Sequence, residues 1–165
     1  MDPVRFQRHL LDTIPLAAAM AVSVTAVDAS GMALSAPLAP NRNDKGCAFG
    51  GSVASLLTLA SWGSVLAALG GQGEAAEVYV QDSHIEYLAP VFQTLHARAG
   101  LAVDDAGAAF LAAWRARGKA RVATRAELVL DDGTVAARLS ARFVALDPAR
   151  RSATIAASSP TGGTA

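Results

Sequence analysis

Cysteine is almost absent from this 165-residue sequence, in which Cys47 is the only one. A single cysteine excludes an internal disulfide framework and a zinc site built from several cysteines. The three histidines are scattered without ligand spacing, so we expect neither a metal nor a cofactor. An excess of one charge sign is also missing, because 14 basic residues balance 14 acidic ones. A protein with balanced charge lacks the excess of basic residues that nucleic-acid binders use to neutralise backbone phosphates. We therefore expect no nucleic-acid partner.

Charged residues of either sign are few, at 17%, whereas hydrophobic residues make up 52%. This composition excludes intrinsic disorder for most of the chain, and the length favours one domain with a sizeable core. We predict a single domain over 1–147 and a flexible tail over 148–165. The first residues carry charges of both signs before any apolar run, so no signal peptide is evident and we expect a cytoplasmic protein.

The longest segment without a charged residue runs from Gly46 to Gly73. At about 1.5 Å per residue, a helix of this length could span a bilayer. Several serines and glycines interrupt the segment, however, and its neighbours alternate like strands, which do not flank a lone membrane helix. We therefore predict a helix buried on nearly all faces of a soluble protein, with no membrane association. The glycines at 70, 71 and 73 predict where it ends.

The rest of the chain predicts a mostly antiparallel sheet with a few helices. Apolar spacing predicts an amphipathic helix over 2–14, which Pro15 ends. Strands are predicted at 18–28, 32–38, 77–88, 94–103, 120–130 and 134–146, and a short helix at 107–117. Residues Asp131-Asp132-Gly133 predict a tight turn between the last two strands.

Alternation also predicts which side chains share a strand face. The first strand should carry Met20, Val22, Val24 and Ala26 on one face. One side of the strand at 77–88 should carry Tyr79, Gln81, Ser83, Ile85 and Tyr87.

Segregated helices and an antiparallel sheet define an α+β architecture. A single sheet curled around the uncharged helix would explain why that helix lacks a polar face. Such a sheet leaves open edges and one uncovered face, so we expect dimerisation by edge pairing.

The richest candidate site is the junction of loop and helix between Asn41 and Ser52. Paired glycines leave backbone N–H groups approachable at a helix N-terminus, which carries about half a positive charge. Such an end can polarise a carbonyl or hold an oxyanion. A glycine kink with a serine N-cap would explain the same residues without a function. The crowding of Asn43, Asp44 and Lys45 beside these glycines favours a functional site.

Two sequence strings at this point resemble a known family. The strings NDKGCAFGGS at 43–52 and IEYLAPV at 85–91, with the uncharged helix between them, resemble the YiiD C-terminal-type thioesterases of the hotdog-fold superfamily. The resemblance covers most of residues 14–146. It implies a hotdog fold, in which a curled antiparallel sheet wraps around a long central buried helix.

The wider superfamily, notably its phenylacetyl-CoA-type thioesterases, has the pattern Asn-x-x-Gly-x-x-His-Gly-Gly at the start of the central helix. Asn43, Gly46, Gly50 and Gly51 match this pattern, whereas Phe49 stands in the histidine position. Those enzymes also use an acidic residue further along the helix, and that position holds a threonine here, Thr58.

The resemblance implies hydrolysis of an acyl thioester carried by coenzyme A or by an acyl-carrier protein. The N–H of Gly51, or that of Gly50, would polarise the thioester carbonyl. Asp44 is the candidate general base, with Asn43 orienting water or substrate. Thr58 can only hydrogen-bond, because an unaided hydroxyl is no base.

The remaining candidates are substrate contacts at the helix start and on the following strand. They are Phe49, Ser52, Ser55, Asp82, Ser83 and His84. Asp82, Ser83 and His84 are also an alternative source of the general base. The dimers implied by the hotdog resemblance would let these residues reach the site of a partner subunit.

A basic run could hold the phosphates of coenzyme A or form a solvated face. It consists of Arg115, Arg117, Lys119, Arg121 and Arg125. Two other functions stay open: a non-catalytic acyl-thioester binding module, and a hotdog hydratase or dehydratase, which would need a histidine with a carboxylate. In each case we expect a homodimer or a dimer of dimers.

Overall fold

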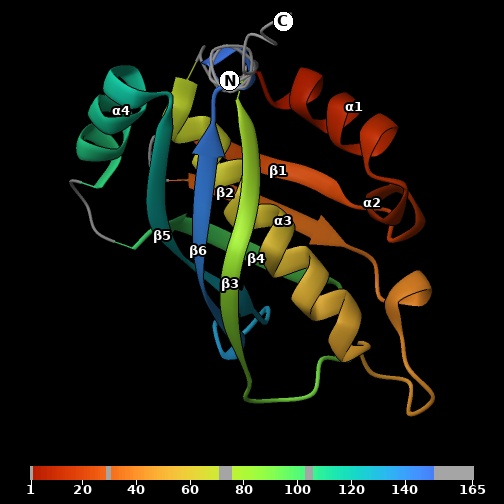
Figure 1. Ribbon diagram of the computed structural model, residues 1–165. Coiled ribbons are helices and arrows are strands. Elements are labelled where there is room, and N and C mark those ends of the chain that lie inside the picture. The colour runs from red at the N-terminus through yellow and green to blue at the C-terminus, as the bar shows by residue number, and fades with distance from the viewer. Residues whose placement is uncertain (1, 29–30, 71–75, 103–105, 151–165) are drawn as a thin grey trace, which may run out of the picture.

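The computed structural model describes residues 2–28, 31–70, 76–102 and 106–150. Figure 1 shows a sheet with one long helix on its inner face and smaller helices at its periphery. The helices are α1 (Pro3–Thr13), α2 (Pro15–Ala19), a short 3-10 helix (Ala39–Asn41), α3 (Gly50–Leu69) and α4 (Ala106–Arg117). The strands are β1 (Ser23–Asp28), β2 (Gly31–Ala36), β3 (Glu77–Tyr87), β4 (Leu95–Leu101), β5 (Lys119–Val129) and β6 (Val135–Leu146).

The strands form one six-stranded sheet in the order β1-β2-β4-β5-β6-β3, with every neighbouring pair antiparallel. The predicted α+β class and curled antiparallel sheet are therefore confirmed. The turn predicted between β5 and β6 is present too, with Gly133 at φ +86°.

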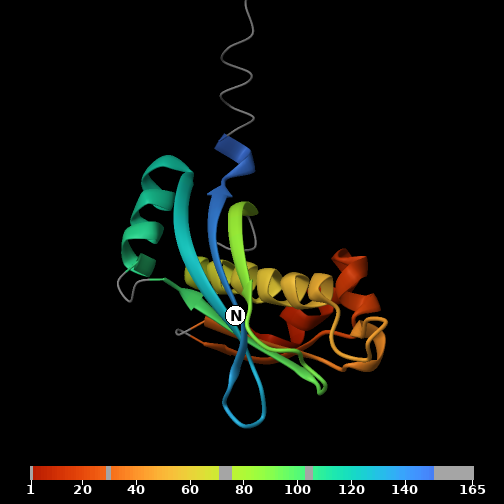
Figure 2. The same cartoon turned by 90° about the horizontal axis from the view of Figure 1, so that it is seen from below.

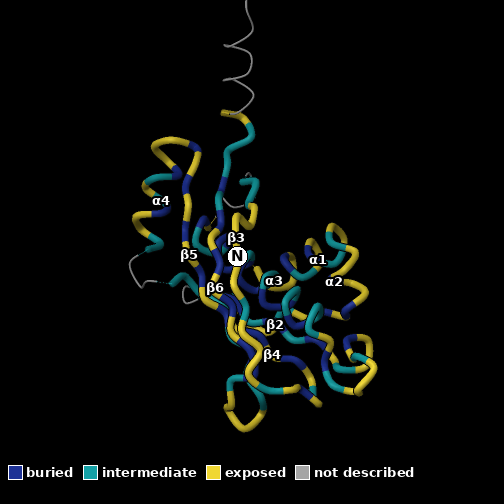
Figure 3. The backbone as a smooth tube through the Cα atoms, turned by 60° about the horizontal axis from the view of Figure 1, so that its bottom comes forward, coloured by how far each residue is buried: buried dark blue, intermediate teal, exposed yellow. Residues whose placement is uncertain are grey.

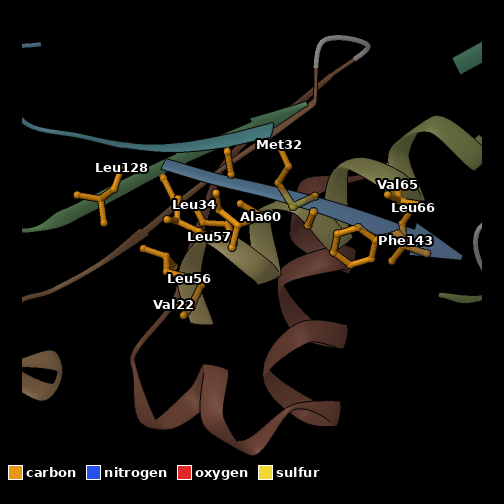
Figure 4. Packing of buried hydrophobic residues seen from close by; sticks show 14 of the residues in the cluster. Val22, Met32, Leu34, Leu56, Leu57, Ala60, Val65, Leu66, Leu128 and Phe143 are labelled. Atoms are coloured by element: carbon orange, nitrogen blue, oxygen red, sulfur yellow. The ribbon is translucent and has the colours of Figure 1, made fainter. Parts of the chain in front are cut away.

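Helix α3 forms the core because it contacts every strand of the sheet. Leucine and valine side chains of the helix pack against those of β2, β5 and β6 (Figure 4). No charged residue interrupts α3, and two of its hydroxyls, those of Thr58 and Ser64, donate to carbonyls one helical turn back. Ser64 Oγ donates to Ala60 O at 2.9 Å and lies 2.9 Å from Ala99 O on β4. Gly70, at φ +58°, follows the last residue of the helix as predicted.

The two edges of the sheet differ in how they are covered. At the β1 edge, the side chain of Gln7 on α1 accepts a hydrogen bond from Val24 N–H at 2.7 Å. At the β3 edge, the six residues from Tyr79 to His84 are all exposed (Figure 3). The longer uninterrupted exposed stretch is therefore at the β3 edge, since Val24 and Val27 of β1 are half-buried.

The first strand begins later than predicted. Residues 18–22 are not extended, because Pro15 starts a second short helix, α2, instead of merely ending α1. Met20 and Val22 are buried but precede β1, and a register shift between Val24 and Ala26 breaks the alternation. The predicted shared face of these four residues is therefore wrong.

The alternation predicted for the strand at 77–88 also fails at one point. A bulge between Val80 and Asp82 shifts the register of β3 against β6. Asp82 pairs with exposed Arg142 and Ser83 with buried Ala141, so Ser83, Ile85 and Tyr87 share the inner face as predicted. Tyr79, which precedes the bulge, pairs with Val144 and lies on the other face.

By length and composition, α3 is the one helix of the described residues apolar enough to cross a membrane. Just over half of its most apolar window, 56%, is buried inside the fold. That burial is accounted for by its contacts with the sheet.

Leu57→Ala tests the central position of α3. Leu57 is fully buried, so the change should lower the free energy of unfolding by about 3–5 kcal/mol, through lost transfer free energy and a residual cavity. Leu16→Ala is the matched control, because this side chain is 53% exposed. Urea unfolding followed by circular dichroism measures both. Equal losses in the two variants would contradict the packing described above.

Candidate active site at the start of α3

The N-terminus of α3 presents backbone donors that the protein does not use. The first helical bond runs from Val53 N–H to Phe49 O at 3.0 Å, and no side chain caps the helix. The N–H groups of Gly50, Gly51 and Ser52 therefore have no acceptor among the described residues. Three open donors at the positive end of a 20-residue helix can bind a carbonyl oxygen or an oxyanion.

Two exposed aromatic side chains border these donors. Phe49 and Tyr87 are 56% and 54% exposed, although both rings are large and apolar. A side chain at Gly51 would overlap the Phe49 ring, and one at Gly50 would touch the Tyr87 ring at 3.5 Å. The Tyr87 hydroxyl donates to Gly50 O at 3.0 Å. The glycine at 51 thus lets the Phe49 ring lie against the backbone, whereas a side chain at 50 would make only an ordinary contact with Tyr87.

The loop before α3 is held by Asn41, which is buried. Its side-chain amide donates to Met20 O at 2.9 Å and to Pro37 O at 2.8 Å. Its backbone carbonyl accepts Phe49 N–H at 2.7 Å. These bonds tie the residue that precedes α3 to the body of the protein.

The tip of the loop is a tight turn that uses the polar atoms of Asn43. Its Oδ1 accepts Lys45 N–H at 2.8 Å, and its Nδ2 lies 3.2 Å from the sulfur of Cys47. Gly46, one of the residues that match the superfamily pattern, has φ +83°, a backbone conformation that favours glycine. Asp44 is exposed and forms an ion pair with Lys45 at 2.9 Å. The structure thus gives Asn43 a turn-forming role and leaves Asp44 facing solvent.

A half-buried stripe of small and polar residues runs along α3 from the open donors. Gly51, Ser55, Thr58 and Trp62 follow each other at helical spacing and are all half-buried. We call these four residues the α3 stripe. Thr58 Oγ1 donates to Ala54 O at 2.8 Å, which leaves the hydroxyl oxygen able to accept from water. Trp62 packs on Phe6 of α1 at the far end of the stripe.

The three polar candidates on β3 lie on two different faces. Ser83 is on the inner side with Tyr87, whereas Asp82 and His84 are on the outer side, opposite Arg142 and Ser140 of β6. Asp82 is bonded by the Arg142 guanidinium at 2.8 Å, which raises the pKa of Arg142. The structure therefore does not bring Asp82 or His84 to the α3 donors of the same chain.

An apolar pocket of about 290 Å³ adjoins the first turn of α3. Its walls are mostly small residues, among them Ala48, Val53, Val91, Ala136 and Ala137. Tyr87 and Gly50 also line it, so the pocket opens beside the α3 donors. A pocket of this composition suits an alkyl or acyl group.

Sequence reasoning missed two residues that shape the site. Asn41 was included in the junction but not recognised as its anchor, because burial of a loop asparagine leaves no mark in a single sequence. Tyr87 was assigned only to a strand face, although it lies within the string at 85–91 that carried the family resemblance. That string was the signal that could have found it.

A family model described as "Putative thioesterase (yiiD_Cterm)" matches residues 4–147. The chain belongs to this family, which confirms the resemblance drawn from its two sequence strings. A search of curated protein sequences finds no significant match.

Solved structures share the fold over nearly the whole chain. A protein of unknown function from Chlorobaculum tepidum is 25% identical with a TM-score of 0.81, covering 88% of this chain and 94% of that one. A "putative thioesterase" from Shewanella oneidensis is 27% identical with a TM-score of 0.76, covering 87% and 96%. A thioesterase from Haemophilus influenzae, 12% identical, is similar in fold alone, with a TM-score of 0.69 and coverage of 89% and 92%. The curled sheet around α3 is thus the hotdog fold of thioesterases.

Proposed function

We propose that the protein hydrolyses an acyl thioester of coenzyme A or of an acyl-carrier protein at the N-terminus of α3. The observation that carries this proposal is the set of three unused N–H donors at Gly50, Gly51 and Ser52. Donors aimed at a developing oxyanion are commonly the largest single contribution to acyl-transfer catalysis. Membership of a thioesterase family supports the same reaction.

In the proposed reaction, the thioester carbonyl oxygen accepts from the Gly51 N–H, with Gly50 beside it. The acyl group enters the apolar pocket next to Tyr87, and Phe49 and Ser52 contact the substrate. Water held by Ser55 and Thr58 on the α3 stripe attacks the carbonyl carbon. A carbon–oxygen bond forms, the carbon–sulfur bond breaks, the general base takes the proton of water, and the thiolate leaves and is protonated. We retain Asp44 as the proposed base.

Gly51→Pro tests the donor, because proline lacks the N–H. Turnover, measured as thiol release from a panel of acyl-CoA thioesters, should fall by about 10²–10³. Gly51→Ala is the matched control: it displaces the Phe49 ring in the same way but keeps the N–H, so most of the activity should remain.

Gly50→Pro provides a second variant that should fold normally. Phe49 already has the extended backbone that a residue before proline prefers, with φ −68° and ψ 132°, and proline is favoured at the first helical position. Folded proline variants with unchanged turnover would refute the role of the donors. Binding of acyl-CoA without any turnover of the panel would favour the non-catalytic binding module.

Asp44→Asn tests the general base. The amide keeps the shape of the side chain but cannot take a proton, so turnover should fall by about 10²–10⁴. Asp12→Asn, an exposed carboxylate on α1, is the control and should have no effect. Should Asp44→Asn retain full activity while His84→Gln loses it, β3 would be the source of the base and the assignment of Asp44 would be wrong.

We propose further that two copies pair through their β3 edges. The six exposed residues from Tyr79 to His84 support this pairing, since an open edge is a template for another strand. Pairing there would also cover the exposed aromatic residues beside the α3 donors and bring a second chain to the site.

Val80→Asp tests this edge. Val80 is 47% exposed on β3, and a carboxylate from each copy at the edge should raise the dimer dissociation constant by at least about tenfold. Sedimentation equilibrium should give twice the 16.8 kDa chain mass for the unmodified protein, or four times for a dimer of dimers. Val4→Asp on α1, where the side chain is 69% exposed, should change nothing. A monomeric unmodified protein would contradict the pairing.

A further inference from the structure

A groove of about 670 Å³ lies between α4 and the first half of β5. Strand β4 pairs with β5 only as far as Leu101 opposite Thr124, so within the described part of the chain residues 119–123 have no strand neighbour on that side. Helix α4 occupies this side instead and presents to it the residues Ala106, Ala109, Phe110, Ala113 and Arg117, which recur at helical spacing. Because most of these side chains are small, a space remains beside the strand. We call it the α4–β5 groove.

Two cations line this groove where α4 ends. Arg117 and Lys119 form no ion pair among the described residues. The nearby carboxylate of Asp147 pairs with Arg150 at 3.6 Å. Arg121 also borders the groove, but its Nε bonds to Gln81 Oε1 on β3 at 3.0 Å, so its charge is directed across β6 and away from α4. An anion in the groove would therefore meet two cations that have no ion-pair partner among the described residues.

Charge and apolar surface are separated along the groove. Arg117 and Lys119 lie at one end, where α4 turns into β5 through Gly118. At the other end the described lining residues are apolar, namely Ala102, Ala106 and Phe110, and Ala102 N–H donates to Ala123 O at 2.9 Å. One charged end and one apolar end are what a single-chain amphiphilic anion requires, and the volume is within the range of about 300–1,000 Å³ for ligand sites.

The groove is separate from the candidate active site. Figure 2 shows α4 and the loop that precedes α3 at opposite ends of the molecule. Along β5, Ala123 at the near end of the groove is five residues from Leu128, whose partner Ala137 lines the pocket beside α3. At about 3.3 Å per residue, the two sites are roughly 17 Å apart where they come nearest.

We propose that the α4–β5 groove binds a free fatty-acid anion, with its carboxylate at Arg117 and Lys119 and its alkyl chain running past Arg121 towards Ala102. The basic run of the sequence thus serves a carboxylate rather than a phosphate. This inference does not depend on the proposed hydrolysis, because it concerns binding alone.

Isothermal titration calorimetry of the full chain with decanoate, well below its micelle concentration, tests the proposal. We expect one decanoate per chain. Decan-1-ol, which has the same alkyl chain but no charge, should bind at least about tenfold more weakly. Chemical-shift mapping with ¹⁵N-labelled protein should place the changes on α4 and on residues 119–123 of β5.

Two pairs of variants make the test specific. Arg117→Gln combined with Lys119→Gln should weaken decanoate binding about tenfold, whereas Arg8→Gln with Arg125→Gln removes the same charge outside the groove and should not. Ala109→Trp should fill the groove and abolish binding. Ala112→Trp is its control, because Ala112 is equally exposed on α4 but does not line the groove.

Four results would overturn the proposal. They are no decanoate binding at all, equal binding of the alcohol, shift changes confined to the first turn of α3 and Tyr87, and insensitivity to both groove variants. Light scattering adds a further check, since an oligomer that Ala109→Trp dissociates would make a second copy of the chain the occupant instead.

Discussion

The burial of α3 against the concave face of the sheet is the constraint on which the structure depends. A helix that contacts every strand cannot carry a charge without desolvating it, so the 20 residues of α3 contain none. The hydroxyls of Ser64 and Thr58 are satisfied by carbonyls of the preceding turn. Its first N–H groups have no acceptor among the described residues, because the first turn of a helix lacks intrahelical partners and no side chain caps this one. One helix thus provides both the core and the electrostatic feature of the candidate site.

The two edge strands of the sheet differ in how far they are exposed. Helix α1 packs against β1 and accepts a hydrogen bond from Val24, whereas β3 is exposed along six consecutive residues. The candidate site lies against this open edge, since Tyr87 ends β3 and bonds to Gly50 at the start of α3. An exposed sheet edge and the candidate site therefore coincide, which is why the proposed dimer and the proposed chemistry belong together.

The sequence predicted the elements well, because its signals were local. An uncharged run closed by glycines marked α3, alternation marked the strands, and Asp131-Asp132-Gly133 marked the last hairpin. The errors arose where non-local packing decides. The bulge at Val80 and Asp82 reassigns strand faces, and nothing in the local alternation reveals it. The anchoring role of Asn41 and the contact of Tyr87 with α3 depend on residues distant in sequence. Spacing identifies Gly50 and Gly51, but the two aromatic rings beside them, Phe49 and Tyr87, are placed by contacts that spacing does not reveal.

The most direct test of the central claim is the infrared stretching frequency of a substrate carbonyl at the α3 terminus. The ligand would be a ¹³C-labelled ketone analogue of acyl-CoA, in which a methylene replaces the thioester sulfur so that no hydrolysis occurs. Binding to the unmodified protein should lower the carbonyl frequency below its value in water, and Gly51→Pro should remove that shift while Gly51→Ala keeps it. A carbonyl frequency in the bound state equal to that in water, or a shift that survives Gly51→Pro, would contradict polarisation by the helix N-terminus.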